Sequence, residues 1–224
     1  MKHFLILFLC LAGLTQIHAQ GVRDWADFEH YSQANAELKK PAKVVFMGNS
    51  ITRRWPETHP DFFKENEGYV GRGISGQVSA QMVMRFRQDV IDLKPQAVVI
   101  HPGTNDIALN ALAMTVEKTF DNVKTMVELA RAHKIKVVLC STMPSSKFPW
   151  RPEVKPAEDI KRLNAMMKQY CKENKIVYVD YHSVMQDENG GLPEKYSEDG
   201  VHPNLEGYKV MEKILQKALK KIVK

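Results

Sequence analysis

Asp199 and His202 lie three residues apart near the end of the chain, in the segment Asp-Gly-Val-His-Pro-Asn. An aspartate at this spacing can orient an imidazole through one ring N–H and leave the other ring nitrogen to take a proton from a serine. Ser50, between an apolar run and a predicted helix start, is the candidate for that serine. Taken separately, the Asp and His pair is more often structural, and the serine could equally be a helix N-cap. Together they predict nucleophilic catalysis by Ser50, His202 and Asp199.

Two further segments carry groups that can donate hydrogen bonds to a developing oxyanion. Gly76 lies in the glycine-rich segment 71–77, where the backbone must adopt a positive φ or approach another group closely. Asn105, in segment 103–106, offers a side-chain amide. Alone, the first segment is a turn and the second a loop. With the backbone N–H of Ser50, they form a candidate oxyanion hole of Ser50, Gly76 and Asn105, provided that the fold brings them together.

The hydrophobic pattern predicts the strands that would position these residues. Short apolar runs, mostly rich in valine and isoleucine, alternate with longer amphipathic stretches, as in a parallel sheet covered by helices on both faces. Apolar residues recur at helical spacing within 116–130, 160–170 and 205–219. The candidate catalytic segments then fall just after strand ends or before the final helix. The predicted strands are residues 43–48, 69–73, 96–101, 135–141 and 176–180.

The longest irregular segment, residues 143–156, follows a predicted strand. It should therefore lie at the carboxyl end of the sheet, where open α/β folds bind ligands. Two exposed-looking aromatic residues, Phe148 and Trp150, belong to it. Trp150 and Trp55 are candidate substrate contacts because an indole ring can stack on a sugar, although packing at the sheet edge is the ordinary role of such side chains.

The start of the chain has the pattern of a secretory signal. Lys2 precedes an apolar run over residues 4–14 that is too short to span a bilayer, and small or polar residues follow it. We expect a signal peptide over residues 1–19 and a secreted or periplasmic mature protein with no stable membrane insertion; a buried N-terminal helix or strand is the alternative. Residues 20–224 suffice for one sizeable core and predict a single domain.

Composition and motif spacing argue against several partners and cofactors. The formal net charge of +6 comes from Lys and Arg spread along the chain, with one cluster within 217–224 of the kind found on solvated helix faces. Nucleic acid is therefore not an expected partner. The sequence has no C-x-x-C or H-E-x-x-H spacing that would indicate a metal site. Cys140 and Cys171 could pair, but their apolar surroundings favour two buried thiols.

The four segments resemble the sequence blocks of the SGNH or GDSL-type hydrolases, named for Ser, Gly, Asn and His. Their counterparts here are Ser50, Gly76, Asn105 and His202, in the order of the family. The resemblance implies a three-layer α/β/α flavodoxin-like fold with a five-stranded parallel sheet. It also implies Ser50 as nucleophile, His202 as base, Asp199 as the residue that orients it, an oxyanion hole at the three positions given above, and no metal or organic cofactor.

One position departs from the pattern of that family. The block around the serine usually reads Gly-Asp-Ser, and here it reads Gly-Asn-Ser, so that Asn49 keeps the shape of aspartate and loses its charge. Because the acid of the triad belongs to the last block, the change should alter local hydrogen bonding and leave the mechanism in place. The G-x-S-x-G elbow of the other serine hydrolases with similar layering is absent from the sequence.

The favoured function is hydrolysis of short acyl esters, above all O-acetyl groups on carbohydrates. The segments after the relevant strands contain no long apolar insertion able to bury a fatty chain. A lysophospholipase or thioesterase of the same fold is an alternative, since fold and triad do not decide between these substrates. A carbohydrate-binding protein that kept the fold without catalysis is another, and the intact set of site residues weakens it.

Overall fold

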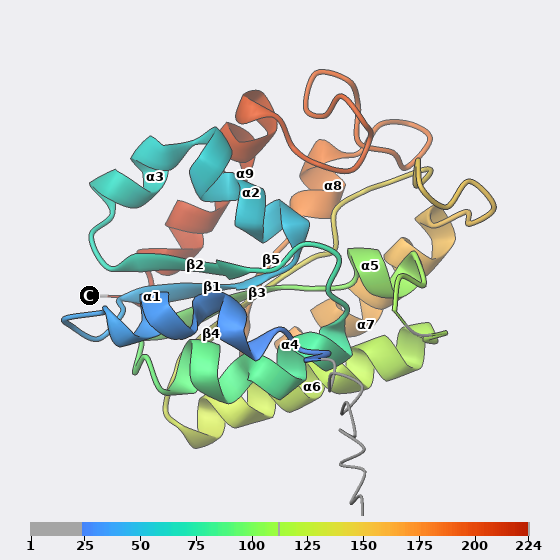
Figure 1. Cartoon of the computed structure of the whole chain (residues 1–224). Coiled ribbons are helices and arrows are strands. Elements are labelled where there is room, and N and C mark those ends of the chain that lie inside the picture. Colours follow the sequence, from blue (N-terminus) through green and yellow to red (C-terminus); the bar gives the residue numbers. More distant parts are fainter. Residues whose placement is uncertain (1–23, 112, 224) are drawn as a thin grey trace, which may run out of the picture.

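The computed structural model describes residues 24–111 and 113–223. The expected signal peptide, residues 1–19, lies outside the described residues. Within them, a parallel sheet of five strands has the order β2-β1-β3-β4-β5, which confirms the predicted α/β class and sheet (Figure 1). The strands are β1 (Val44–Gly48), β2 (Tyr69–Gly73), β3 (Ala97–His101), β4 (Lys136–Cys140) and β5 (Val177–Val179).

Helices connect the strands and cover both faces of the sheet, as parallel connections require. The longer ones are α2 (Ser50–Thr58), α4 (Ser79–Phe86), α6 (Val116–Ala132), α7 (Ala157–Asn174) and α9 (Leu205–Leu219). The shorter ones are η1 (Phe28–Tyr31), α1 (Ser32–Ala36), α3 (Pro60–Glu65), η2 (Arg87–Ile91), α5 (Thr104–Ile107) and α8 (Tyr181–Met185). Figure 1 shows α4, α6 and α7 on one side of the sheet and α2, α3, α8 and α9 on the other.

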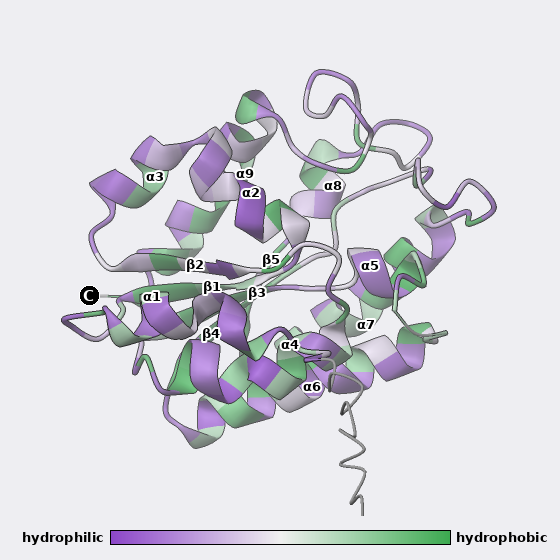
Figure 2. Cartoon of the chain, in the orientation of Figure 1, coloured by the Kyte–Doolittle hydropathy of each residue, from purple (hydrophilic) through white to green (hydrophobic). Residues whose placement is uncertain are grey.

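Alternating side chains of β1, an interior strand of the sheet, contribute to both cores. Val45 and Met47 of β1 pack into the layer that contains α4, α6 and α7, whereas Val44 and Phe46 pack into the layer that contains α2, α3, α8 and α9. In the coloured ribbon, hydrophobic segments line the strands and the inward faces of the helices (Figure 2). Burial on both faces explains why the strands are apolar without alternation.

The register of the central strands determines where the site can form. Gly48 at the end of β1 pairs with Gly73 at the end of β2 and with His101 at the end of β3. The segments that follow these three strands therefore start side by side. Ser50 begins α2 only two residues after Gly48, and Asn105 lies in α5, directly after β3.

The observed strands are one to two residues shorter than the predicted ones at several ends. β5 ends at Val179 because Asp180 instead caps α8, its side chain accepting a hydrogen bond from the Ser183 N–H at 3.0 Å. Cys140 and Cys171 are free, buried thiols, as favoured from the sequence. Burial raises the pKa of each to about 12. None of the helices within the described residues is long and apolar enough to cross a membrane.

His101 is a buried histidine whose titration should make the fold sensitive to acid. Its side chain is 4% exposed, and burial lowers its pKa to about 4. The unfolded chain, with a histidine pKa of about 6.5, therefore binds a proton that the folded chain does not bind as pH falls from about 6.5 to about 4. The free energy of unfolding should decrease across this window by about 3 kcal/mol, roughly 2 kcal/mol of it between pH 7 and pH 5.

Urea unfolding at pH 7 and pH 5 measures this decrease. His101→Gln removes the titrating ring, so the variant should be less stable at pH 7 and yet lose less stability on acidification than the parent chain. Equal pH dependence of the two proteins would contradict the assignment of the effect to His101.

Candidate active site

Two hydrogen bonds connect Ser50, His202 and Asp199. Ser50 Oγ lies 2.8 Å from His202 Nε2, and His202 Nδ1 lies 2.6 Å from Asp199 Oδ2. Because a carboxylate only accepts hydrogen bonds, Nδ1 carries the ring proton, and Nε2 is left to accept from the serine hydroxyl. The structure thus brings together residues separated by 152 positions in the sequence. The arrangement is that of a serine nucleophile next to an oriented base.

The short loop around Asp199 holds its carboxylate in the charged form. Oδ1 accepts hydrogen bonds from the backbone N–H of Val201 at 2.9 Å and of His202 at 2.7 Å, and from Ser197 Oγ at 3.1 Å. Partial burial by itself would raise the pKa of Asp199. The hydrogen bonds from the backbone and ring of His202 and from Val201 outweigh that effect and lower the pKa to about 2. Asp199 is therefore ionised throughout the neutral range.

Ser50 is the first residue of α2, and Asn49 is the N-cap of that helix. The Asn49 side-chain oxygen accepts a hydrogen bond from the Ile51 N–H at 3.1 Å, and its backbone oxygen accepts from the Arg53 N–H at 2.9 Å. The capping bond needs only an oxygen acceptor, which asparagine supplies as well as aspartate. The Ser50 N–H belongs to the first turn, where amides have no acceptor within the helix. Asn49 thus keeps the local helix start that the more usual aspartate would give.

Asn105 is connected to Gly76 through Gln77, the residue that follows Gly76 in the sequence. The Asn105 Nδ2 donates to the backbone carbonyl of Gln77 at 2.9 Å, and Asn105 is 3% exposed. Gly76 has φ +78°, a conformation that L side chains rarely adopt, and a Cβ built there would meet no atom within 4 Å. The glycine therefore permits this backbone conformation, and the space that a side chain would fill is open. Both candidate oxyanion donors occupy the same corner of the site.

Two buried charged residues, neither of them assigned a firm role from the sequence, support this corner. Arg85 on α4 is 0% exposed, and it donates to Gln77 Oε1 at 2.6 Å and to the Gly48 carbonyl at 3.0 Å. Asp106 accepts from the backbone N–H of Ser79 at 2.9 Å and from its hydroxyl at 2.5 Å. These bonds tie the ends of β1 and β3 to the segment that contains Gly76. Arg85 was missed in the sequence, although its place between Met82 and Phe86 on an apolar helix face is a usable signal.

Trp150 lies beside the candidate base, at the carboxyl end of the sheet as expected for its loop. Its indole ring is tilted over His202 with the ring centroids 6.2 Å apart, and 41% of the residue is exposed. Phe148 from the same loop stacks under it at 5.3 Å but is fully buried, which corrects the expectation that both aromatics are exposed. Trp150 is thus a partly exposed aromatic residue beside His202.

Trp55 is wrongly placed among the candidate substrate contacts. It is 2% exposed and stacks between Phe62 and Tyr208, at centroid distances of 5.4 and 5.3 Å. Its indole N–H donates to Glu212 Oε1 at 2.8 Å. The apolar ring is therefore part of the core under α2, with its single polar atom satisfied inside the protein.

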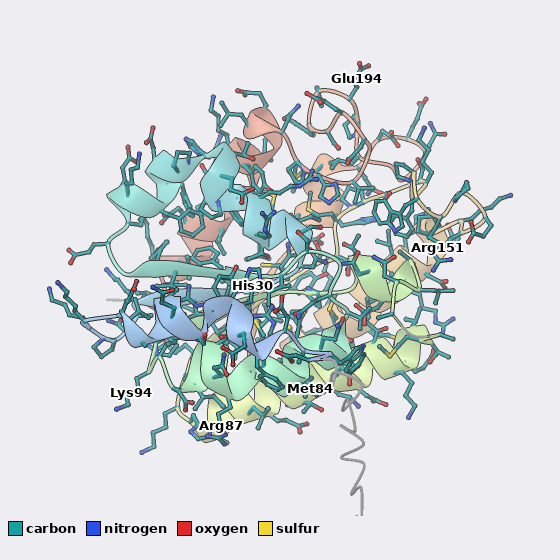
Figure 3. All side chains as sticks on the ribbon, in the orientation of Figure 1. His30, Met84, Arg87, Lys94, Arg151 and Glu194 are labelled. Carbon is teal, nitrogen blue, oxygen red and sulfur yellow. The ribbon has the colours of Figure 1, made fainter. Side chains whose placement is uncertain are left out.

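A cavity of about 570 Å³ borders the candidate triad on the side of Asp199. The loop after β4 and the loop before α9 form its walls, and Figure 3 shows Arg151 and Glu194 projecting from these two loops. Charged side chains, among them Lys147, Glu194 and Glu198, lie on it beside a few apolar ones. This cavity is therefore a recess of mixed polar and apolar character beside Asp199.

Comparison with known proteins is decisive at the level of family. The model of the GDSL-like lipase/acylhydrolase family matches residues 46–210, a range that contains Ser50, Gly76, Asn105, Asp199 and His202. The chain belongs to this family. Its fold agrees with that of family members of known structure. A protein from Bacteroides fragilis NCTC 9343 assigned to the acylhydrolases is 53% identical, with a TM-score of 0.87 over 89% of this chain and 98% of that one.

Other GDSL-like proteins extend the similarity. A GDSL-like lipase from Bacteroides thetaiotaomicron VPI-5482 is 50% identical, with a TM-score of 0.85 over 88% of this chain and 98% of that one. The lipoprotein YqeF of Bacillus subtilis is 28% identical over 64% of this chain, and an acetylxylan esterase of Xylanibacter ruminicola is 27% identical over 59% of it. The matches span only 58% and 30% of the lengths of these two relatives.

Proposed function

We propose that this GDSL-family chain is a serine ester hydrolase with Ser50 as nucleophile. The observation that carries the proposal is the pair of hydrogen bonds from Ser50 Oγ to His202 Nε2 at 2.8 Å and from His202 Nδ1 to Asp199 Oδ2 at 2.6 Å. A hydroxyl is a weak nucleophile until a neighbouring base removes its proton. These contacts supply such a base, with its proton-accepting nitrogen directed at the hydroxyl.

The proposed reaction has two halves. Ser50 Oγ attacks the acyl carbonyl carbon as its proton passes to His202 Nε2, and the carbonyl oxygen becomes an oxyanion that accepts hydrogen bonds from the backbone N–H groups of Ser50 and Gly76 and from Asn105 Nδ2. Collapse of this intermediate releases the alcohol, which takes the proton from Nε2, and leaves Ser50 acylated. Water then gives a proton to Nε2 and attacks the acyl carbonyl carbon, and Ser50 Oγ takes that proton from Nε2 as it leaves, which releases the carboxylic acid and regenerates the free serine. Asp199, ionised throughout, stabilises the imidazolium that forms twice per turnover.

We propose that the acyl group is short, with acetyl as the principal example, and that the alcohol is a carbohydrate. Trp150 is a partly exposed indole beside His202, and the cavity beside Asp199 carries charged side chains among apolar ones. Selection of a long chain would draw on roughly 0.8 kcal/mol for each buried methylene, which requires a continuous apolar surface. The similarity to an acetylxylan esterase is consistent with this substrate class.

The chain-length preference can be measured with p-nitrophenyl esters. We expect kcat/KM to be highest for the acetate or propionate and to fall by at least about tenfold towards the octanoate, since a methylene that finds no apolar contact adds no transition-state stabilisation. Release of acetate from acetylated xylan should accompany this preference for short esters. Trp150→Ala should weaken the polysaccharide reaction, through KM, more than hydrolysis of p-nitrophenyl acetate.

A steady rise of kcat/KM from acetate to octanoate would contradict this substrate class and would favour a lipid or thioester substrate. Ser50→Ala is the blank for spontaneous hydrolysis in every assay.

For location, we propose export under an N-terminal signal over residues 1–19, leaving a single catalytic domain over residues 20–224. The similarity to a lipoprotein of Bacillus subtilis is in keeping with a protein that acts outside the cytoplasm. A carbohydrate ester would be met there.

A further inference from the structure

Asn110 lies between the exposed tryptophan and the candidate oxyanion donor. Its side-chain oxygen accepts a hydrogen bond from Trp150 Nε1 at 2.8 Å, and its side-chain nitrogen donates to Asn105 Oδ1 at 2.8 Å. The backbone adds a third contact, because the Asn110 N–H donates to the Asn105 carbonyl at 3.1 Å. Asn110 is thus held at both ends of its amide, between two residues of the site.

The direction of this chain of hydrogen bonds is fixed at its two ends. An indole N–H can only donate, so the end of the Asn110 amide that faces Trp150 must be its oxygen. The nitrogen then faces Asn105, which must present its own oxygen. At the far end the Gln77 carbonyl can only accept, and it receives Asn105 Nδ2 at 2.9 Å. Each amide is therefore held in one of its two orientations by its neighbours.

That orientation matters for the oxyanion. The Asn105 amide nitrogen has two hydrogens, and the bond to the Gln77 carbonyl uses one of them. The second hydrogen can be given to the substrate oxygen. Were the amide turned round, its oxygen would face both the Gln77 carbonyl and the oxyanion, and both contacts would be repulsive.

We infer that Asn110 is a positioning residue, which holds the Asn105 amide with its N–H groups towards the oxyanion and ties that orientation to Trp150. The inference rests on the proposed function, in which Asn105 is an oxyanion donor. A second bond between the same two loops, from Arg151 Nη2 to the Leu109 carbonyl at 3.3 Å, keeps the tryptophan next to Asn110. A substrate that packs on Trp150 therefore acts on a group connected to the oxyanion hole.

A double-mutant cycle on p-nitrophenyl acetate tests the positioning role. Asn105→Ala should lower kcat on the order of a hundredfold, and Asn110→Ala on the order of tenfold with KM changed by less than about twofold. If Asn110 acts through Asn105, the double variant should be no slower than Asn105→Ala alone. Multiplication of the two losses, or no loss in Asn110→Ala, would overturn the inference.

Two further variants separate the effect of amide orientation from the effect of side-chain packing. Asn110→Asp keeps an acceptor for Trp150 but presents an oxygen to Asn105 Oδ1, which favours the reversed amide. It should therefore be slower than Asn110→Ala, although it preserves shape. Trp150→Phe keeps an aromatic ring but removes the indole N–H together with part of the ring system, and should lower kcat by about threefold in the parent chain and not at all in Asn110→Ala. The aspartate variant serves for the cycle if the alanine variant fails to fold.

Asn174→Ala is the matched control, since Asn174 is likewise partly buried and donates one side-chain hydrogen bond, to the Tyr170 carbonyl at 2.9 Å. It should leave kcat unchanged. Labelling of Ser50 by a fluorophosphonate distinguishes the two levels of the proposal. A parent chain that neither hydrolyses esters nor becomes labelled overturns both the proposed function and the positioning role. An active, labelled parent with additive losses overturns only the role of Asn110.

Discussion

Replacement of Ser50 by alanine is expected to abolish ester hydrolysis, with a loss in kcat of at least about 10⁴-fold. The side chain of Ser50 is the only group brought within 2.8 Å of His202 Nε2 by a hydrogen bond in the described structure, and the acyl-enzyme cannot form without it. The residual rate would come from substrate binding and the oxyanion donors, with water as the nucleophile. Initial rates on p-nitrophenyl acetate, with mass spectrometry of the fluorophosphonate adduct, measure both the loss and the site of labelling.

The fold should tolerate this substitution, because the capping contacts of α2 are made by Asn49. Thermal unfolding of Ser50→Ala and of a surface control, Ser183→Ala, checks this point. The control should retain the parent rate, since Ser183 lies at α8 and its backbone N–H bonds to Asp180. Labelling of another serine, together with an active Ser50→Ala, would contradict the proposed nucleophile.

Asp199→Asn is expected to lower kcat on the order of 10³-fold while leaving KM nearly unchanged. The carboxylate oxygen Oδ2 accepts a hydrogen bond from the protonated His202 Nδ1, and the two atoms are 2.6 Å apart. An asparagine can turn its NH₂ group to Nδ1, and the ring then places its own proton on Nε2. In that tautomer Nε2 cannot accept the serine proton, and the imidazolium loses its counter-charge. The loss should therefore fall on the chemical step.

The pH dependence of this loss follows from the lowered pKa of Asp199. A carboxyl whose pKa falls from an ordinary 3.8 to about 2 on folding makes its full contribution to the free energy of unfolding above its ordinary pKa. That contribution disappears as pH falls towards 2. Asp199 should accordingly stay ionised between pH 5 and pH 8, so protonation of its own carboxyl adds no pH dependence to the loss within this window. A loss below about threefold at pH 7 would show that Asp199 is not the group that orients His202.

The sequence was sufficient to predict the fold and to place the candidate site segments after strand ends, because both depend on local pattern. Strands β1 and β3 are buried along their whole length and read as apolar runs, and Ser50, Gly76 and Asn105 each lie in a segment that follows a strand whose end is in register with its neighbour. The pairing of Asp199 with His202 spans only three residues and needs no knowledge of the rest of the fold.

Trp55 could have been placed correctly from helix geometry. Five residues separate it from Ser50 on α2, which corresponds to about 140° around the helix axis. The two side chains therefore cannot face the same way. Ile51 lies one turn before Trp55, and both are buried on the face that packs against the core. The aromatic side chain of Trp55 suggested a surface on which a sugar could stack, whereas its position in the helix indicated a place in the interior.

The positions of Arg85 and Asn110 depend on tertiary partners and not on local pattern. Arg85 finds its acceptors on Gln77 and Gly48, which come from other segments of the chain. Asn110 finds Trp150 forty residues away, across two irregular loops with no periodicity to predict their meeting. Supporting hydrogen bonds of this kind become visible only when the sheet has brought its loops together.

The two hydrogen bonds of the candidate triad differ greatly in the length of chain they close. Asp199 and His202 are three residues apart, so their contact closes a short loop and can form while most of the chain is still unfolded. Ser50 and His202 are separated by 152 residues, and their contact requires β1 and the start of α9 to have reached the same edge of the sheet. Acid and base can therefore assemble locally, whereas the nucleophile joins them only through the completed topology. Recovery of ester hydrolysis during refolding would thus report the closure of the whole sheet and not the formation of the loop that carries Asp199 and His202.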